Sequence, residues 1–339
     1  MASLPETYTA AVVDEPNGGL VIKEVPLREP EHGEVLVRVK ACGVCHGDAA
    51  VTAGTFGKLP IVPGHEFIGD VVALGPGEKK WQVGDRVGGA WHGGHDGICA
   101  QCNRGQFQMC GKAVANGVHK DGGYAQYALL RTEATVRVPR DLDPVQAAPL
   151  LCAGVTVFNC IRNMHVRPGG TVAIQGLGGL GHLALQYARK LGYRVFALSR
   201  DGKKKDFALE LGATDYVDGS KESAVEALQR AGGADLVLVT APSADTIGQL
   251  VHACAPGGTV AILAPFADIT ISTIPLILKG VSVRGWPSGH ALDCEEALAF
   301  AQTQGVRCMV EEFPLAKANE AMAHMLNGEV RFRAVINTA

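Results

Sequence analysis

Thiol, imidazole and carboxylate side chains gather in two parts of the sequence, and both groups consist of the residue types that bind zinc. The first group is dispersed and comprises Cys45, His46, Asp48, His65, Glu66 and Cys152. Two thiolates and one imidazole would leave the fourth position of a tetrahedral zinc ion open for water or substrate. A metal ion in such a site acts as a Lewis acid, which polarises a carbonyl group or lowers the pKa of an alcohol. The first group therefore indicates a catalytic metal site.

The second group is compact and lies within one loop. It contains three thiols, those of Cys99, Cys102 and Cys110. In a reducing compartment, such close spacing favours zinc over disulfides, and a closed structural site needs four ligands. Asp96 stands three residues before Cys99 and is the first candidate for the fourth ligand, with His92 and His95 as rivals. The alternative is an empty loop with three free cysteines.

A glycine-rich turn is a third candidate site, for a dinucleotide. The turn, G-L-G-G-L-G, contains Gly176, Gly178, Gly179, Leu180 and Gly181. It follows an apolar run at 171–175 and opens a stretch with helical periodicity, which is the context in which this pattern binds a dinucleotide. Glycines allow the backbone to approach a pyrophosphate at the helix N-terminus, where free N–H groups favour an anion. The alternative is a tight turn with only a structural role.

The residues after the next apolar run bear on the choice of cofactor. An NAD enzyme usually carries Asp or Glu there, which accepts hydrogen bonds from the ribose 2′-hydroxyl. This chain instead has Ser199 and Arg200, followed by three lysines that include Lys204. A serine and cations suit a 2′-phosphate, so the sequence predicts NADP(H). Asp201 keeps NAD possible, and the lysines could instead be the solvated start of a helix.

Two kinds of scaffold must position these residues. Residues 1 to about 150 contain short alternating runs separated by turn residues, which predicts a β-rich domain. A helix is expected over 145–165, and apolar runs then alternate with helical stretches, which predicts a parallel sheet with crossover helices. Six such runs are found, near 171–175, 194–199, 214–217, 235–240, 258–263 and 281–285. Six is the strand number of a doubly wound dinucleotide fold. Two helical stretches and a strand at 333–338 close the chain.

Composition and charge exclude several classes of protein. Among the 339 residues, 31 basic and 34 acidic side chains give a net charge of −3 without a basic stripe, which argues against nucleic-acid binding. No apolar run is long enough to span a bilayer, and the first residues lack the features of a signal peptide. We therefore expect a cytoplasmic protein that acts on a small molecule. The cysteines outside the two groups are expected to be small buried residues.

In the order and spacing of its motifs, the chain resembles the zinc-dependent alcohol dehydrogenases of the medium-chain dehydrogenase/reductase superfamily. The matching segments are GVCHGD, PGHEFIGDVVALG, VGDRVG, the cysteine loop, DGGYAQY, AAPLLCAGVTVF and GLGGLG. The resemblance covers the whole length. It implies a β-rich, GroES-like catalytic domain over 1–150 and 287–339, and a doubly wound, six-stranded Rossmann domain over 151–286. It also implies a homodimer or homotetramer.

The resemblance assigns roles to the dispersed group. Cys45, His65 and Cys152 would bind the catalytic zinc, and Glu66 would stand behind the metal, able to replace a departing ligand. Asp48 would orient His65 through the other nitrogen of its ring.

Further roles follow from the same resemblance. Cys42 would not be a ligand, despite its spacing from the next cysteine. His46 would approach the cofactor pyrophosphate, while Phe56 and Trp91 would be walls of the substrate pocket. Trp286 could flank the nicotinamide. The compact group, Cys99, Cys102, Cys110 and Asp96, would hold a structural zinc.

The chain departs from the family pattern at three positions. Asp96 replaces the usual first cysteine of the loop. Gly47 stands where relatives usually have Ser or Thr, and Ala50 where many have the histidine that ends a proton relay. Hydride transfer needs a matching proton transfer, so water, the cofactor ribose or another side chain must supply it. We further expect a site that is wider at Gly47.

Together these features predict a zinc-dependent oxidoreductase that transfers a hydride between NADP(H) and an alcohol, aldehyde or ketone. The predicted wide site favours carbonyl reduction of bulky or aryl substrates. The first alternative is an NADPH-dependent reductase of an activated C=C or C=N bond in a biosynthetic pathway, which the missing relay supports. The second is a non-catalytic NADPH-binding protein, which an intact set of zinc ligands opposes.

Overall fold

The computed structural model describes residues 4–241, 244–264 and 268–338, and the chain divides into two compact units. The first unit comprises Met1–Val155, Gly289–Thr303 and Arg307–Ala339, and the second comprises Thr156–Ser288 and Gln304–Val306. The chain thus enters the second unit after Val155, five residues beyond the limit that the sequence suggested, and leaves it after Ser288. Each unit is described by itself.

The second unit is built on a six-stranded sheet in which every neighbouring pair is parallel. Its strands are β10 (Thr171–Gln175), β11 (Arg194–Ser199), β12 (Asp215–Asp218), β13 (Ala234–Val239), β14 (Cys254–Ile262) and β15 (Ser282–Gly285). Their order in the sheet is β12-β11-β10-β13-β14-β15. This is the doubly wound order 3-2-1-4-5-6, so the predicted Rossmann architecture is confirmed.

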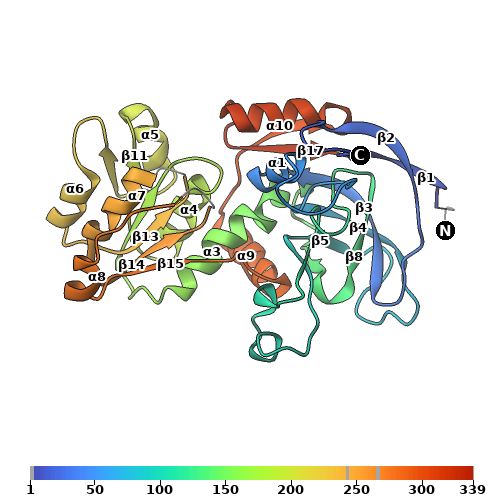
Figure 1. Ribbon diagram of the computed structural model, residues 1–339, viewed down its shortest axis with the longest axis horizontal. Helices are drawn as coiled ribbons and strands as arrows, with labels where there is room; N and C mark the ends of the chain where they lie inside the picture. Colours follow the sequence, from blue (N-terminus) through green and yellow to red (C-terminus); the bar gives the residue numbers. More distant parts are fainter. Residues whose placement is uncertain (1–3, 242–243, 265–267, 339) are drawn as a thin grey trace. The chain divides into compact units, whose positions relative to one another are not determined.

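Helices connect these parallel strands, as crossover connections require. They are α4 (Gly181–Lys190), α5 (Lys205–Glu210), α6 (Ala224–Arg230), α7 (Ala244–Leu250) and α8 (Ile274–Lys279), with 3-10 turns η5 (Gly202–Lys204) and η6 (Val251–Ala253). A further helix, α3 (Ala153–Asn163), begins in the first unit and precedes β10. Figure 1 draws this unit in green to orange, with the helices around the sheet. The central strand β10 is buried on both faces, which explains its unbroken apolar sequence.

The first unit contains a seven-stranded sheet and two two-stranded sheets. The large sheet runs β16-β17-β3-β4-β5-β9, with β8 also paired to β3, and the small sheets are β1-β2 and β6-β7. The strands are β1 (Thr7–Val12), β2 (Val21–Pro26), β3 (Glu34–Gly43), β4 (Phe67–Leu74), β5 (Arg86–Gly89), β6 (His92–Gly94), β7 (Val114–Ala115), β8 (Tyr127–Arg131), β9 (Val136–Arg137), β16 (Val310–Pro314) and β17 (Arg333–Asn337). The predicted β-rich domain is therefore confirmed.

Short helices complete the first unit and help to close its core. They are α1 (His46–Thr52), α2 (Pro144–Ala147), α9 (Ala291–Gln304) and α10 (Ala318–Asn327), with 3-10 turns η1 (Cys102–Arg104), η2 (Phe107–Met109), η3 (Thr132–Ala134), η4 (Ala148–Leu151) and η7 (Leu315–Lys317). The helix α10 lies along β17 (Figure 1). Phe67, Trp81 and Tyr124 from the sheet and its loops share one apolar cluster with Met322 and Met325 of α10. This cluster fixes the strands whose ends carry the candidate site.

The single helix expected over 145–165 is wrong. The segment forms α2, η4 and α3, and Cys152 interrupts it with φ −122° and ψ −73°. Pro149 has no N–H to donate and its ring clashes with the carbonyl four residues before it, so an α-helix cannot run through this point. Within the described residues, no single helix could cross a membrane, and only the bent pair Pro144–Leu151 and Ala153–Asn163 meets the length and composition criterion.

Candidate active site and metal centres

The fold brings the dispersed ligand-type residues together. The ligand atoms of Cys45, His65, Glu66 and Cys152 all lie within 4.8 Å of one another, and the two Sγ atoms are 3.9 Å apart. Cys45 precedes α1, His65 and Glu66 precede β4, and Cys152 stands at the interruption before α3. Three distant parts of the sequence therefore supply two thiols, one imidazole and one carboxylate to a single point in the first unit.

Asp48 orients this group from the first turn of α1. Its buried Oδ1 lies 2.9 Å from Nδ1 of His65, so the Nε2 atom of His65 remains available as a metal ligand. The carboxylate also accepts hydrogen bonds from the backbone N–H of Cys45 (2.9 Å), the backbone N–H of Gly64 (3.1 Å) and the hydroxyl of Tyr124 (3.0 Å). Asp48 thus ties together two of the three segments that supply ligands, those of Cys45 and His65, and fixes them to the buried Tyr124.

The electrostatics of the group favour a bound cation. A hydrogen bond from the neighbouring Cys152 thiol outweighs burial and, with His65, holds the pKa of Cys45 well below its ordinary value. Burial raises the pKa of Glu66 to about 8, and its Oε2 atom is buried without a hydrogen-bond partner. Sulfur and imidazole nitrogen donors are the combination that zinc prefers. The residues present therefore fit a zinc ion, with Cys45, His65 and Cys152 as its ligands.

Arg333 is a residue of this site that our sequence analysis missed. It begins β17, is 3% exposed, and donates a hydrogen bond to Oε1 of Glu66. The Arg333 guanidinium opposes the effect of burial on the pKa of Glu66, and although burial lowers the pKa of Arg333, the acidic groups around it raise that pKa overall. The sequence did contain a signal for this role. Arg333 opens the short run R-A-V-I-N, whose next three residues are apolar, and a charge that is buried with such a run needs a partner.

Aromatic side chains stand beside the ligand group. The Trp91 ring meets the His65 ring edge-on at 4.9 Å between centroids, and Phe56 meets Trp91 in the same way at 6.5 Å. A Cβ atom on Gly47 would lie 3.0 Å from Cε1 of His65 and 3.1 Å from Cζ3 of Trp91. The expected widening at Gly47 is therefore wrong, because Trp91 and His65 already fill the space next to it. His46 is exposed, and buried Cys42 lies outside the ligand group.

The cysteine loop forms a second ligand group in the first unit. One ligand atom from each of Asp96, Cys99, Cys102 and Cys110 lies within 4.8 Å of the others. The Sγ atoms of Cys99 and Cys102 are 3.6 Å apart, and Oδ1 of Asp96 is 3.4 Å from Sγ of Cys102. Three thiols and a carboxylate in this arrangement fit a closed tetrahedral zinc site.

Asp96 is held in place before any metal binds. Its Oδ1 accepts hydrogen bonds from the backbone N–H groups of Ile98 and Cys99, both at 3.0 Å, and these donors hold the pKa of Asp96 well below its usual range. The rival histidines are occupied elsewhere, since Nδ1 of His95 lies 3.2 Å from Nε2 of His92 and their rings stack. Asp96 is thus the residue that the fold brings to the fourth position.

The glycine turn joins β10 to α4 in the second unit. Gly176 has φ +91°, and a Cβ there would lie 2.4 Å from Cβ of Ala241. A Cβ on Gly181 would lie 2.0 Å from the carbonyl oxygen of Gly176, whereas one on Gly178 would meet nothing within 4 Å. The first and last positions need glycine for close packing, while the backbone at Gly178 is open. An open backbone at the start of a helix is a cradle that fits a pyrophosphate.

The residues expected at a ribose phosphate lie around the end of β11. Ser199 ends the strand, Arg200 is exposed, and Nζ of Lys204 donates to the carbonyl of Leu177 in the glycine turn at 2.8 Å. The side chain of Asp201 accepts the backbone N–H of Lys203 at 3.0 Å and so caps η5. The cationic side chain of Lys204 therefore stands next to the turn, and the carboxylate of Asp201 is used in a helix cap.

Comparisons with known proteins agree with this architecture. The sequence matches the family described as "Alcohol dehydrogenase GroES-like domain" over residues 31–140 and the family described as "Zinc-binding dehydrogenase" over residues 179–303. It is 53% identical over 336 residues to the alcohol dehydrogenase patD of Penicillium expansum, with 99% of each chain covered.

Solved structures are similar over almost the whole chain. The cinnamyl alcohol dehydrogenase SbCAD4 from Sorghum bicolor has a TM-score of 0.88 at 30% identity, covering 98% of this chain and 97% of its own. A zinc-binding dehydrogenase from Sinorhizobium meliloti, bound to NADP, has a TM-score of 0.89 at 28% identity, covering 98% of this chain and 100% of its own. Together with the two domain matches, these likenesses show that the chain is an oxidoreductase of the zinc-dependent alcohol dehydrogenase family in the medium-chain dehydrogenase/reductase superfamily.

Proposed function

We propose that this chain is a zinc- and NADP(H)-dependent oxidoreductase of alcohols, aldehydes and ketones that works mainly as a carbonyl reductase. The observation that carries the proposal is the convergence of Cys45, His65 and Cys152, with the Nδ1 atom of His65 held by Asp48. We also propose a second zinc ion, with a structural role, in the Asp96–Cys110 loop. The free thiols of both groups suit a reducing compartment such as the cytoplasm.

The residues around the first group prepare it for a carbonyl substrate. When bound, zinc supplies a Lewis acid for the substrate oxygen, and NADPH supplies the hydride. Asp48 keeps the His65 ring in one orientation, which preserves the geometry of the ligand group. Trp91 and Phe56 present an apolar aromatic surface beside His65. A flat aryl group would pack against such a surface, so we propose aromatic aldehydes and ketones as the substrate class.

The proton must take a different route from the usual relay. Gly47 has no hydroxyl and Ala50 has no imidazole, so neither side chain can pass a proton onward. Cys45 and Cys152 are half-buried, whereas His65 and Glu66 are buried, so solvent can reach the ligand group only at its two cysteines. We propose that water, or the cofactor ribose, exchanges the proton with the substrate oxygen.

A substrate panel separates this proposal from reduction of a C=C or C=N bond. Zinc-loaded protein would be mixed with NADPH or NADH and with aromatic aldehydes, ketones, imines and α,β-unsaturated aldehydes, and the products would be identified. We expect NADPH oxidation with the carbonyl compounds and an allylic alcohol from each unsaturated aldehyde. A saturated aldehyde or an amine as the main product would support the alternative instead, and no oxidation of either cofactor would support a binding protein.

Replacing Arg200 by alanine is expected to lower kcat/KM for NADPH by about tenfold to a hundredfold, because one charge-assisted hydrogen bond to the 2′-phosphate is lost. The value for NADH should change little. The measurement is steady-state kinetics with each cofactor. Lys203→Ala is the matched control, since Lys203 is a neighbouring and highly exposed cation for which we propose no contact. An unchanged preference in the Arg200 variant would contradict the proposed NADP(H) site.

We also propose a homodimer or homotetramer that uses the β15 edge of the second unit. The helix α8 directly precedes β15 in the chain. Three of its apolar residues are largely exposed: Ile274 (63%), Ile277 (78%) and Leu278 (79%). Exposed apolar side chains beside the edge strand of a sheet are typical of an interface, and a closed two-fold assembly would cover both copies of the edge at once.

The double variant Ile277→Glu, Leu278→Glu is expected to lower the mass of the particle in solution, because carboxylates would have to be buried at the proposed interface. Light scattering after size-exclusion chromatography gives the mass directly. Leu326→Glu is the control, since Leu326 is 52% exposed on α10 of the first unit. If the wild-type chain is monomeric, or the double variant keeps the wild-type mass, this edge is not the interface.

A further inference from the structure

Three rings form a continuous stack between the Asp96–Cys110 loop and the wall of the active site. Phe107 stacks on His95 with 4.3 Å between centroids and an interplanar angle of 25°. His95 stacks on His92 at 5.1 Å and 21°, and the two imidazoles are joined by the 3.2 Å contact between their nitrogens. We refer to Phe107, His95 and His92 as the ring stack.

One end of the ring stack belongs to the second ligand group. Phe107 lies between Cys102 and Cys110 in the sequence, within η2, so its position depends on how the loop closes around its metal site. The ring also meets His290 edge-on at 5.2 Å, and His290 directly precedes α9. Phe107 therefore links the conformation of this loop to His95 and His290 in the rest of the first unit.

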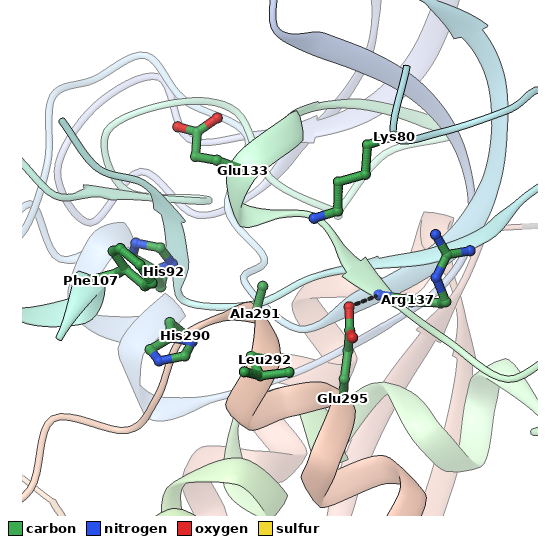
Figure 2. Close-up of a pocket in the computed structure, with 9 residues that line it drawn as sticks. All are labelled: Lys80, His92, Phe107, Glu133, Arg137, His290, Ala291, Leu292 and Glu295. Atoms are coloured by element: carbon green, nitrogen blue, oxygen red, sulfur yellow. Dashed lines mark hydrogen bonds between the residues drawn. The ribbon is translucent and has the colours of Figure 1, made fainter. Parts of the chain in front are cut away.

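The ring stack borders a cavity of about 220 Å³. Figure 2 shows Phe107 and His92 together on one wall of this cavity, with His290 next to them. Side chains on the cavity side cannot pack tightly against the rings, because that space holds no protein atoms. The rings are held by their contacts with one another, by the contact of Phe107 with His290 and by the pairing of His92 in β6 with β7. Burial lowers the pKa of His92 to about 3, so its imidazole is uncharged and suited to stacking.

The other end of the ring stack reaches the active site through the backbone. His92 begins β6, is 3% exposed, and directly follows Trp91. The Trp91 ring meets His65 edge-on at 4.9 Å, and its Cζ3 atom lies close to Gly47. A shift of His92 would therefore move the side chain that forms the wall beside His65.

We propose that Phe107 and His95 are positioning residues for Trp91, so that the loop of the second ligand group shapes the substrate wall of the active site. Neither residue touches the catalytic ligand group, and both act through His92 and the start of β6. The kinetic consequence rests on the proposed carbonyl reductase function, whereas the structural consequence does not. The proposed coupling runs through the ring contacts from Phe107 to His92 and then through the backbone to Trp91. The variants below test this coupling directly.

The first test is Phe107→Leu in the zinc-loaded enzyme. We expect KM for an aromatic aldehyde to rise by about threefold to tenfold, since a displaced Trp91 would lose an aromatic contact with the substrate, and such a contact contributes about that much beyond its area. We expect kcat and KM for NADPH to stay within about twofold, because the ground state and the transition state lose the same wall contact. Amide hydrogen exchange over residues 88–94 should become faster. Phe107→Tyr keeps the ring and should restore both readouts.

Two further variants keep the result interpretable. Met109→Leu lies in the same 3-10 turn outside the ring stack and should leave KM and exchange unchanged. His95→Leu breaks the stack from its middle and replaces Phe107→Leu if that variant does not fold. Zinc content per chain is measured for each variant, so that loss of the metal is distinguished from loss of the ring.

Specific outcomes would overturn this inference. With zinc retained, unchanged KM and unchanged exchange over 88–94 in both stack variants would show that the rings do not position Trp91. A parallel fall in kcat and stability that Phe107→Tyr does not rescue would assign the rings a merely structural role. If the wild-type protein reduces no carbonyl compound, the proposed function fails, but the exchange measurement still decides whether the ring stack holds β6.

Discussion

Replacing Cys152 by serine is expected to reduce kcat/KM for an aromatic aldehyde by about three orders of magnitude or more, because a Lewis acid contributes several kcal/mol to carbonyl activation. Sγ of Cys152 lies 3.9 Å from Sγ of Cys45, and a serine hydroxyl is a much poorer ligand for zinc than a thiolate. The zinc content should fall from about two ions per chain to about one, since the Asp96–Cys110 loop is untouched. The measurements are steady-state kinetics and elemental analysis of the same preparation.

Cys160→Ala provides the matched control for this change. Cys160 is a buried cysteine of the following helix, α3, and it lies outside both ligand groups. We expect its removal to leave the zinc content at the wild-type level. A Cys152→Ser variant that kept wild-type activity and zinc content would show that this thiol is not a ligand.

Replacing Asp48 by alanine is expected to have the second-largest effect, and this effect should appear in stability as well as in metal binding. Asp48 is fully buried and accepts hydrogen bonds from the backbone of Cys45 and Gly64, the His65 ring and the Tyr124 hydroxyl. Each buried donor left without a partner costs about 1–3 kcal/mol, so we expect a loss of at least about 3 kcal/mol in the free energy of unfolding. Zinc affinity should fall by about tenfold to a hundredfold, because the His65 ring loses its orientation.

A graded series tests this account of Asp48. Urea unfolding and competition with a metal chelator are measured for Asp48→Ala, Asp48→Asn and Tyr124→Phe. The amide introduced by Asp48→Asn still offers one acceptor oxygen, and Tyr124→Phe removes only one of the donors, so stability should fall least in Tyr124→Phe and most in Asp48→Ala. Equal stability and equal zinc affinity across the series would contradict the role of Asp48 in orienting His65.

The strands of the second unit could be predicted closely from the sequence. Each of the six apolar runs overlaps a strand, and the runs at 171–175 and 194–199 coincide with β10 and β11. The strands are parallel, and the central ones, β10 and β13, are buried on both faces, so they are mostly apolar in a way that local pattern reveals. The glycine turn could also be predicted from the sequence, because any side chain at its first or last glycine would clash with neighbouring atoms.

The helix before Cys152 and the space beside Gly47 were both predicted wrongly, for different reasons. Pro149 was visible in the sequence, but the helical periodicity on both sides of it concealed the break at Cys152. The absence of a side chain at Gly47 suggested a wider site, yet Trp91, which is distant in the sequence, occupies the neighbouring space. A local residue decides the first feature, and packing between distant residues decides the second.

Two features of the ligand groups also depended on the tertiary structure. Arg333 reaches Glu66 across 267 residues of sequence, and the pairing of both β17 and β4 with β3 brings them together. Among the three candidates for the fourth position of the cysteine loop, spacing alone favoured Asp96 without excluding His92 or His95. The fold leaves both histidines, stacked on each other, outside the ligand group of the loop.

The central claim is that a zinc ion held by Cys45, His65 and Cys152 is required for carbonyl reduction with NADPH. The most direct measurement removes zinc from the wild-type protein with a chelator, then follows NADPH oxidation by an aromatic aldehyde while zinc is returned in measured amounts. We predict that the depleted protein is inactive and still binds NADPH, and that activity returns as the zinc content approaches about two ions per chain. Full activity in protein that elemental analysis shows to be free of zinc would contradict the account.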